Sequence, residues 1–232
     1  MHGITVKKRI IRSMGLDIHV MPITRVLTGE FQSPLEKSFP GMITRLGAPK
    51  SRLSAKQARE VILGIRRKVA ALAGNPAEWL ESGETAFSEQ YDGQAHDALQ
   101  KFAARQGDPE AAGRPFERDD PRDQECLVRT WRGGATRFPH LTRFCQWYVP
   151  VDFDRPLDFD ERSDVGSSVA LLRELDVLNA SLGLKKDWKD LSSGETVGGF
   201  EEPLYYVRFG WSILHAAART SVAARMPIVF DG

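Results

Sequence analysis

The sequence has few cysteines and no long hydrophobic run. Two cysteines in 232 residues are too few for a disulfide framework, which excludes a small secreted scaffold. The mean hydropathy is −0.34, and no apolar run approaches the roughly 18–20 residues that a membrane-spanning helix needs. The low mean hydropathy and the lack of a long apolar run exclude a transmembrane protein. An apolar content of 41% excludes global disorder.

The familiar catalytic and ligand-binding motifs are also missing. The sequence holds no Walker A loop and no GxGxxG, GxSxG, HExxH, CxxC or EF-hand pattern. Its first thirteen residues, MHGITVKKRIIRS, are basic, but no apolar stretch or small-residue cleavage site follows, so they do not form a secretory signal. We therefore expect a cytoplasmic protein without a cofactor or a membrane partner, and whether it is an enzyme stays open.

Four helices are predicted from apolar stripes with recognisable ends. The clearest follows Ser54, which has capping-box spacing to Gln57, and it stops at Gly74. The other three are expected at about 94–105 after the cap Asp92, from Ser167 or Ser168 to Gly183, and from Pro203 to about Val222.

Strands are predicted to be few and short. Period-two alternation from Leu16 indicates a first strand, and Ile228–Phe230 a last one. Residues 126–131 and 138–149, joined through a Gly-Gly turn, predict a hairpin. Because helices and strands do not alternate regularly, the pattern predicts an α+β fold with four main helices packed around a small, mostly antiparallel sheet.

We expect a single domain over residues 14–232. Residues 28–53 predict a long loop, and residues 107–124, with three prolines, two glycines and one aromatic residue, cannot bury much and predict a mobile loop. Residues 1–13 are either a basic arm or a stretch before a mis-assigned start.

The segment Met14–Val20 reads MGLDIHV. It resembles the opening of a loose group of small uncharacterised bacterial and phage-encoded proteins, which begin MGLDI followed by an aromatic residue or His and then Val. Residues Pro227–Gly232 have a vaguer likeness to the same group. The resemblance implies that Met14 is the natural start and that the source is bacterial or viral, and it implies no activity.

Charge is divided unevenly along the chain. Residues 1–68 contain 14 Lys and Arg and 4 Asp and Glu, whereas residues 69–232 contain 18 and 27. Such asymmetry points to an anionic partner. The predicted basic face consists of Lys56, Arg59, Arg66 and Arg67, opposite the apolar stripe of the helix after Ser54, with Arg52 just before that helix. Alternatively, this face packs against the acidic stretch of the same chain and is neutralised.

The acidic stretch places six carboxylates between residues 152 and 164. Asp152, Asp154, Asp158 and Asp160 are its candidate binding residues. Clustered carboxylates can hold Mg²⁺ or Ca²⁺, but the spacing fits no calcium loop, so no metal is expected. A docking surface for a basic partner and a solvated loop both fit the pattern.

Three further sets of residues could carry chemistry. Asp17 and His19 share one face of the first strand, where an Asp can orient an imidazole for general-base catalysis, or the two are a solvent-facing polar pair. Cys126, His140 and Cys145 could meet across the hairpin, or the cysteines are simply buried. Aromatic residues interleaved with Arg137 and Arg143 fit a single-strand stacking platform or a core strand.

These observations favour an accessory or immunity-like protein that binds another macromolecule, a protein above all, through charged surfaces. One alternative is a hydrolase that acts on a phosphate-containing substrate with Asp17 and His19. The other is nucleic-acid binding through the basic face.

Overall fold

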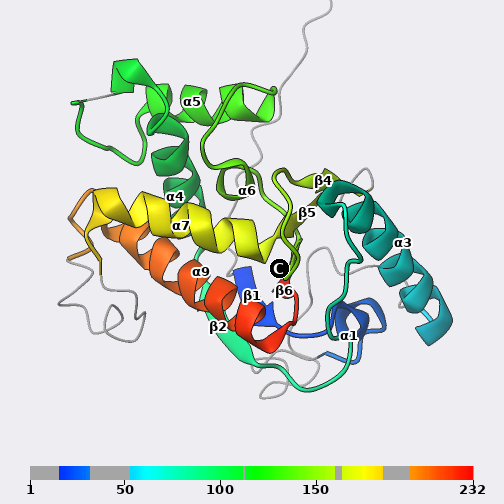
Figure 1. Ribbon diagram of the computed structural model, residues 1–232. Coiled ribbons are helices and arrows are strands. Elements are labelled where there is room, and N and C mark those ends of the chain that lie inside the picture. The colour runs from blue at the N-terminus through cyan, green and yellow to red at the C-terminus, as the bar shows by residue number, and fades with distance from the viewer. Residues whose placement is uncertain (1–15, 32–52, 112, 160–163, 185–198, 232) are drawn as a thin grey trace, which may run out of the picture.

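A six-stranded sheet lies at the centre of the molecule, with helices on both faces (Figure 1). The computed structural model describes residues 16–31, 53–111, 113–159, 164–184 and 199–231. The strands are β1 (Leu16–Val20), β2 (Phe87–Tyr91), β3 (Trp147–Val149), β4 (Leu157–Asp158), β5 (Asp164–Ser167) and β6 (Ile228–Asp231). Their order is β2-β1-β6-β3-β5-β4, and every pairing except β3 with β5 is antiparallel. The predicted α+β class is confirmed.

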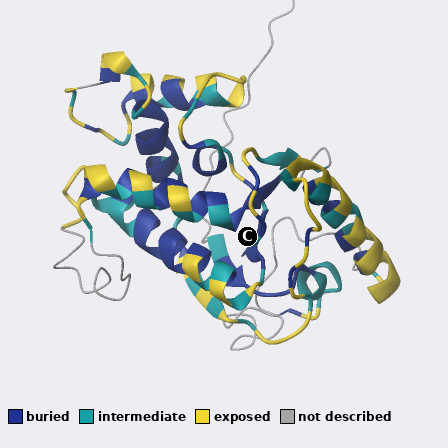
Figure 2. Ribbon diagram, viewed as in Figure 1, coloured by how far each residue is buried: buried dark blue, intermediate teal, exposed yellow. Residues whose placement is uncertain are grey.

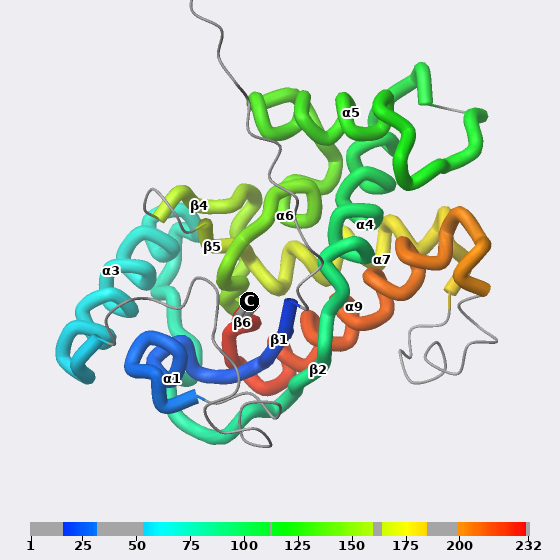
Figure 3. Tube along the Cα trace, turned by 180° about the vertical axis from the view of Figure 1, so that it is seen from behind, coloured from blue at the N-terminus to red at the C-terminus, as the bar shows by residue number. Residues whose placement is uncertain are grey.

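Helices cover the two faces unequally. The longer helices are α3 (Ala55–Ala73), α4 (Gly93–Arg105), α5 (Pro121–Trp131), α7 (Ser168–Leu182) and α9 (Tyr205–Ala224), and the short ones are α1 (Ile23–Leu27), α6 (Pro139–Thr142) and the 3-10 turn η1 (Pro109–Ala111). Helices α4, α7 and α9 pack on one face, and α1 and α3 on the other (Figures 1 and 3). None of the described helices is both long enough and apolar enough to cross a membrane.

The alternation of β1 separates two cores. Ile18 and Val20 pack with α4, α7 and α9, while His19 faces the core formed with α3. The predicted division of β1 between two faces is therefore confirmed. Figure 2 shows α9 mostly buried, whereas α3 keeps one side exposed.

The predicted helix ends are mostly where local signals place them. Ser54 and Gln57 make both hydrogen bonds of a capping box, and Gly74 ends α3 with a φ of 69°. Asp92 caps α4, and Ser167 caps α7. Helix α9 begins at Tyr205, two residues after the expected Pro203.

Helices α4 and α9 approach each other closely at Gly210. An added Cβ on this residue would lie 2.7 Å from the backbone oxygen of Ala95. Glycine lowers the intrinsic stability of a helix, so its place in the middle of α9 reflects this close approach. The contact fixes the buried layer against which the sheet packs.

The predicted hairpin is wrong. Residues 126–131 belong to α5, and of residues 138–149 only β3 is a strand, with α6 before it. Asp120 caps α5 and Pro121 is its first residue, a pair typical of a helix start. In this helix Cys126 and Leu127 are buried, whereas Trp131 is 54% exposed.

The expectation that residues 107–124 bury little is also wrong. Phe116 is 6% exposed and Asp123 is fully buried. The Arg105 guanidinium donates to Asp123 and to the backbone oxygens of Ala111 and Arg114. Whether the segment moves stays a prediction, as does the single domain, and residues 1–13 and most of the loop predicted at 28–53 lie outside the described residues.

Candidate functional site

The predicted pair Asp17 and His19 does share one face of β1. His19 is only 1% exposed, however, with its Nδ1 3.0 Å from the Ser88 hydroxyl and its ring 4.5 Å from that of Phe31. Within the described ranges, no three His, Cys, Asp or Glu side chains lie close enough together to hold a metal. The hydrolase alternative gains no support from this packing.

The cysteines and His140 do not form a thiol–imidazole pair. Cys126 lies on α5 beside Asp108, whereas Cys145 is buried near Tyr148. His140 uses both ring nitrogens: Nε2 lies 2.9 Å from the Phe153 oxygen, and Nδ1 accepts from the Ser167 N–H. Burial lowers the pKa of His140 to about 4, so the ring is neutral, but both of its nitrogens are already hydrogen-bonded; burial also raises the pKa of the Cys145 thiol, which disfavours the thiolate.

Glu174 lies beside His140, and its pKa is raised where that of His140 is lowered. It is 8% exposed and accepts hydrogen bonds from the backbone N–H groups of His140 and Leu141, at 3.0 and 2.8 Å. Burial outweighs these bonds and raises the pKa of Glu174 to about 8. Above about pH 4.5 the unfolded chain loses the Glu174 proton, whereas the folded protein keeps it up to about pH 8.

We expect Glu174→Gln to change how stability depends on pH. Between about pH 4.5 and 8 the folded state binds more protons at this site than the unfolded state, so its contribution to the free energy of unfolding falls as pH rises, by up to about 1.4 kcal/mol per pH unit. Glutamine cannot ionise, so this contribution disappears. Urea unfolding of both proteins between pH 5 and about 8 measures the difference. The exposed Glu125→Gln should run parallel to the wild type, and parallel curves for Glu174→Gln would refute the expectation.

The predicted aromatic platform is largely core. Phe138, Trp147 and Tyr148 are buried, and only Phe144, at 43%, is well exposed. Arg143 is engaged with Asp158 and Asp164. A surface on which several bases could stack is therefore not formed by these residues.

The acidic stretch is partly neutralised within the chain. Both oxygens of Asp152 accept from Arg173, at 2.5 and 2.8 Å, and Asp158 pairs with Arg143. Asp154 is exposed, and Asp160 lies outside the described residues. Helix α3 does approach this stretch, where Lys68 donates to the Phe159 oxygen, but the arginines that pair with the carboxylates come from elsewhere.

The predicted basic face therefore remains charged. Lys56, Arg59 and Arg67 are exposed and form no ion pair with a carboxylate of the described residues. Arg66 is half-buried and donates to the Trp79 backbone oxygen. Arg52 lies outside the described residues. The role of this face as a binding surface stays a prediction.

A second acidic region was not recognised in the sequence. Residues 69–100 contain six carboxylates and neither Lys nor Arg, a signal that a window count would have found. They form the end of α3, the extended segment before β2, β2 itself at the sheet edge, and most of α4 (Figure 3). We call this the acidic edge; its carboxylates are Glu78, Glu81, Glu84, Glu89, Asp92 and Asp97.

The carboxylates of the acidic edge differ in how free they are. Glu81 accepts from Thr24 and the Trp79 indole, Asp92 caps α4, and Asp97 lies 2.6 Å from Lys101. Glu78 and Glu84 are exposed and Glu89 is half-buried, and none of the three forms an ion pair with a described residue. These three make the edge negative toward solvent.

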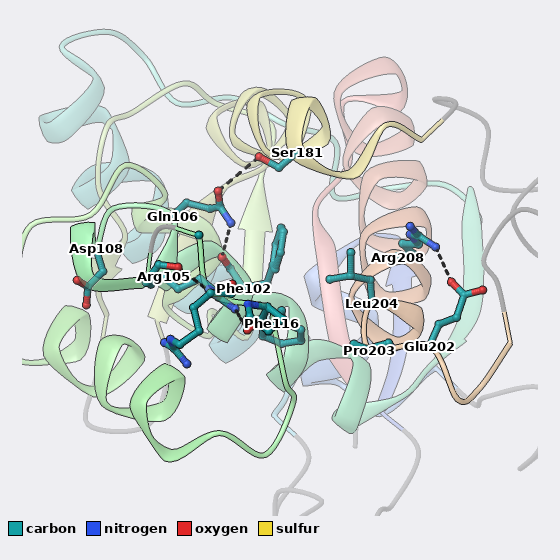
Figure 4. A pocket seen from close by; sticks show the side chains of 14 residues that line it. Phe102, Arg105, Gln106, Asp108, Phe116, Ser181, Glu202, Pro203, Leu204 and Arg208 are labelled. Carbon is teal, nitrogen blue, oxygen red and sulfur yellow. Dashed lines mark hydrogen bonds and ion pairs between the residues drawn. The ribbon is translucent and has the colours of Figure 1, made fainter.

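A cavity of about 590 Å³ lies between the start of α9 and the segment after α4 (Figure 4). Phe102 and Phe116 line one side, and Leu204 the other. Its charged groups are satisfied within the chain, since Arg208 donates to Glu202 and Arg105 to Asp123. The cavity offers apolar surface but no spare charge.

One comparison places the chain among known proteins. A family model described as "Putative DNA-mimic protein" matches residues 14–230. The chain belongs to this family. No curated protein and no solved structure matches it. The portion matched to the DNA-mimic family contains 30 Asp and Glu and 28 Lys and Arg, so any excess of negative charge is local rather than global. The likeness of Met14–Val20 to the MGLDI group is a separate observation and stays a prediction.

Proposed function

We propose that this protein binds a DNA-binding protein and competes with DNA, presenting carboxylates where DNA presents phosphates. The family description supports a macromolecule-binding role with a protein partner, which agrees with the role favoured by the sequence. An accessory or immunity-like protein that blocks a DNA-binding protein in the cytoplasm fits this role.

The acidic edge is the surface that supports the proposal best. A site built for DNA is positively charged and meets a row of phosphates. Glu78 and Glu84 lie in the segment that leads into β2, Glu89 lies in β2 at the sheet edge, and residues 69–100 contain no Lys or Arg. This uninterrupted run of negative charge is the observation that carries the proposal.

The distribution of charge over the described residues agrees with it. These residues contain 25 Asp and Glu and 20 Lys and Arg. Many arginines pair internally, as Arg173 does with Asp152 and Arg143 with Asp158. Arg25 and Arg66 do reach this segment, where they donate to the Thr85 hydroxyl and the Trp79 backbone oxygen, but neither forms an ion pair with Glu78, Glu84 or Glu89.

Competition with DNA provides the test. The full chain, immobilised, is exposed to a lysate of its host, and the proteins retained are assayed for binding to duplex DNA. We expect a DNA-binding protein that is released by added duplex DNA and by raised salt. Changing Glu78, Glu84 and Glu89 together to Gln should weaken its binding by about 10- to 100-fold, since three charges facing a basic site are lost.

The control keeps the same number of charge changes elsewhere. Glu110, Glu117 and Glu125 are exposed on and around η1 and α5, and their combined change to Gln should leave binding within about twofold. If both triple variants lost the same binding affinity, the loss would reflect the total charge of the protein and not the acidic edge. Partners that do not bind DNA, or that duplex DNA does not release, would refute the proposal.

A further inference from the structure

A second charged feature lies beside the acidic edge, and Glu81 belongs to both. A cavity of about 620 Å³ lies between α1 and the first half of α3. Its lining residues are Thr24, Ala55, Lys56, Arg59, Ile62, Leu63, Arg66 and Glu81. The three cations recur along one stripe of α3, at positions 56, 59 and 66, so the helix aims them into the same space.

Arg66 is held in a fixed position at the inner end of this stripe. Its Nη2 donates to the Trp79 oxygen at 2.6 Å, and its guanidinium carbon lies 4.8 Å from the centre of the Trp79 ring. Trp79 is 3% exposed, so the support is rigid. The Arg66 Nε is buried and has no hydrogen-bond partner among the described residues, which leaves a donor unused.

The single carboxylate of the cavity is already engaged. Glu81 Oε2 accepts from the Thr24 backbone N–H at 2.9 Å and from its hydroxyl at 2.8 Å, and Oε1 accepts from the Trp79 indole at 2.5 Å. These bonds anchor α1 against the extended segment and aim the carboxylate at its donors. Three cations and one carboxylate leave the cavity with a net charge of +2.

We propose that this cavity binds the phosphate monoester of a small molecule with an apolar or aromatic group. A phosphate monoester carries about −1.5 to −2 charges at pH 7, which matches the cavity, whereas a carboxylate would leave a cation unpaired. The planar guanidinium of Arg presents N–H donors whose spacing matches phosphate oxygens, so one Arg can donate two parallel hydrogen bonds. Leu63, which is 47% exposed, offers apolar surface to the rest of the ligand, and the buried Ile62 lies beside it in the lining.

Three matched probes test this on the full chain at low salt. Phenyl phosphate has the proposed features, benzoate keeps the ring with a single charge, and inorganic phosphate lacks the ring. By calorimetry we expect phenyl phosphate to bind more tightly than either of the others. Lys56→Gln with Arg59→Gln should lower its affinity by at least about tenfold, because two of the three cations are lost.

A neighbouring arginine supplies the control. Arg67 is exposed on α3, does not line the cavity and, among the described residues, donates to the Leu63 oxygen alone, so Arg67→Gln should keep the affinity within about twofold. Lys56 and Arg59 are exposed, so their replacement should not unfold the chain, and a thermal melt checks this. Equal binding of benzoate, an unchanged double variant, or no phenyl phosphate binding at millimolar concentration would each overturn the proposal.

Discussion

Replacing Asp123 with Ala should lower the free energy of unfolding by about 3–5 kcal/mol. Asp123 is fully buried, and its two oxygens accept from Arg105 at 3.3 Å and from Arg114 at 2.8 Å. Arg105 itself is 5% exposed, so the variant leaves a buried guanidinium without its carboxylate. In the variant, backbone oxygens still accept from Arg105 and Asp120 still pairs with Arg114. Because these contacts remain, we expect a loss near the lower end of this range.

The neighbouring Asp119→Ala is the matched control. The Asp119 side chain is 83% exposed and pairs with the adjacent Arg118, so its loss should cost less than about 0.5 kcal/mol. Urea unfolding of both variants measures the difference. Hydrogen exchange should also locate the effect of Asp123→Ala in residues 105–123, and a loss below about 1 kcal/mol would show that this ion network does not hold the segment.

Trp211→Ala should destabilise the other side of the molecule by about 3–5 kcal/mol. Trp211 is completely buried between α7 and α9, its indole donates to the Leu175 oxygen at 2.8 Å, and its ring stacks on that of His215 at 4.5 Å. Removing it leaves a large void and takes away one hydrogen bond in the layer that covers the sheet, although the Leu175 oxygen keeps its place in the hydrogen bonding of α7.

Trp131→Ala removes the same atoms from an exposed position. Trp131 is 54% exposed, although its indole also donates to a backbone oxygen, that of Thr142. We expect its loss to cost less than about 1 kcal/mol. Thermal unfolding compares the two variants directly. Similar melting temperatures would mean that the layer between α7 and α9 repacks around the void.

The parts of the fold that sequence predicts are those with local signals. Helices α3, α4 and α7 each begin after a residue whose side chain accepts a hydrogen bond from a backbone N–H of the first turn. Helices α3 and α7 also end at a glycine. Helix α5 shows that such signals can be overlooked: Asp120 and Pro121 mark its start, but the apolar run after them favours a strand when read alone.

The missed strands have no local signal of comparable strength. Strand β2 contains only two apolar residues, Phe87 and Tyr91, and β4 contains two residues in all. They are strands because β1 and β5 supply hydrogen-bond partners from distant parts of the chain. The sequence shows that charges are sorted along the chain, but it does not predict which of them pair, because Arg143 and Arg173 meet the acidic stretch only through tertiary packing.

The position of β6 has a consequence for how the chain folds as it is made. This strand comes last among the described strands, yet it lies between β1 and β3 and hydrogen-bonds to both. While the ribosome still holds its residues, β1 with β2 and β3 with β5 are two separate halves with exposed edges. Closure of the sheet therefore waits until β6 has been made and has left the ribosome, and until then the exposed edges of β1 and β3 must not pair with other chains.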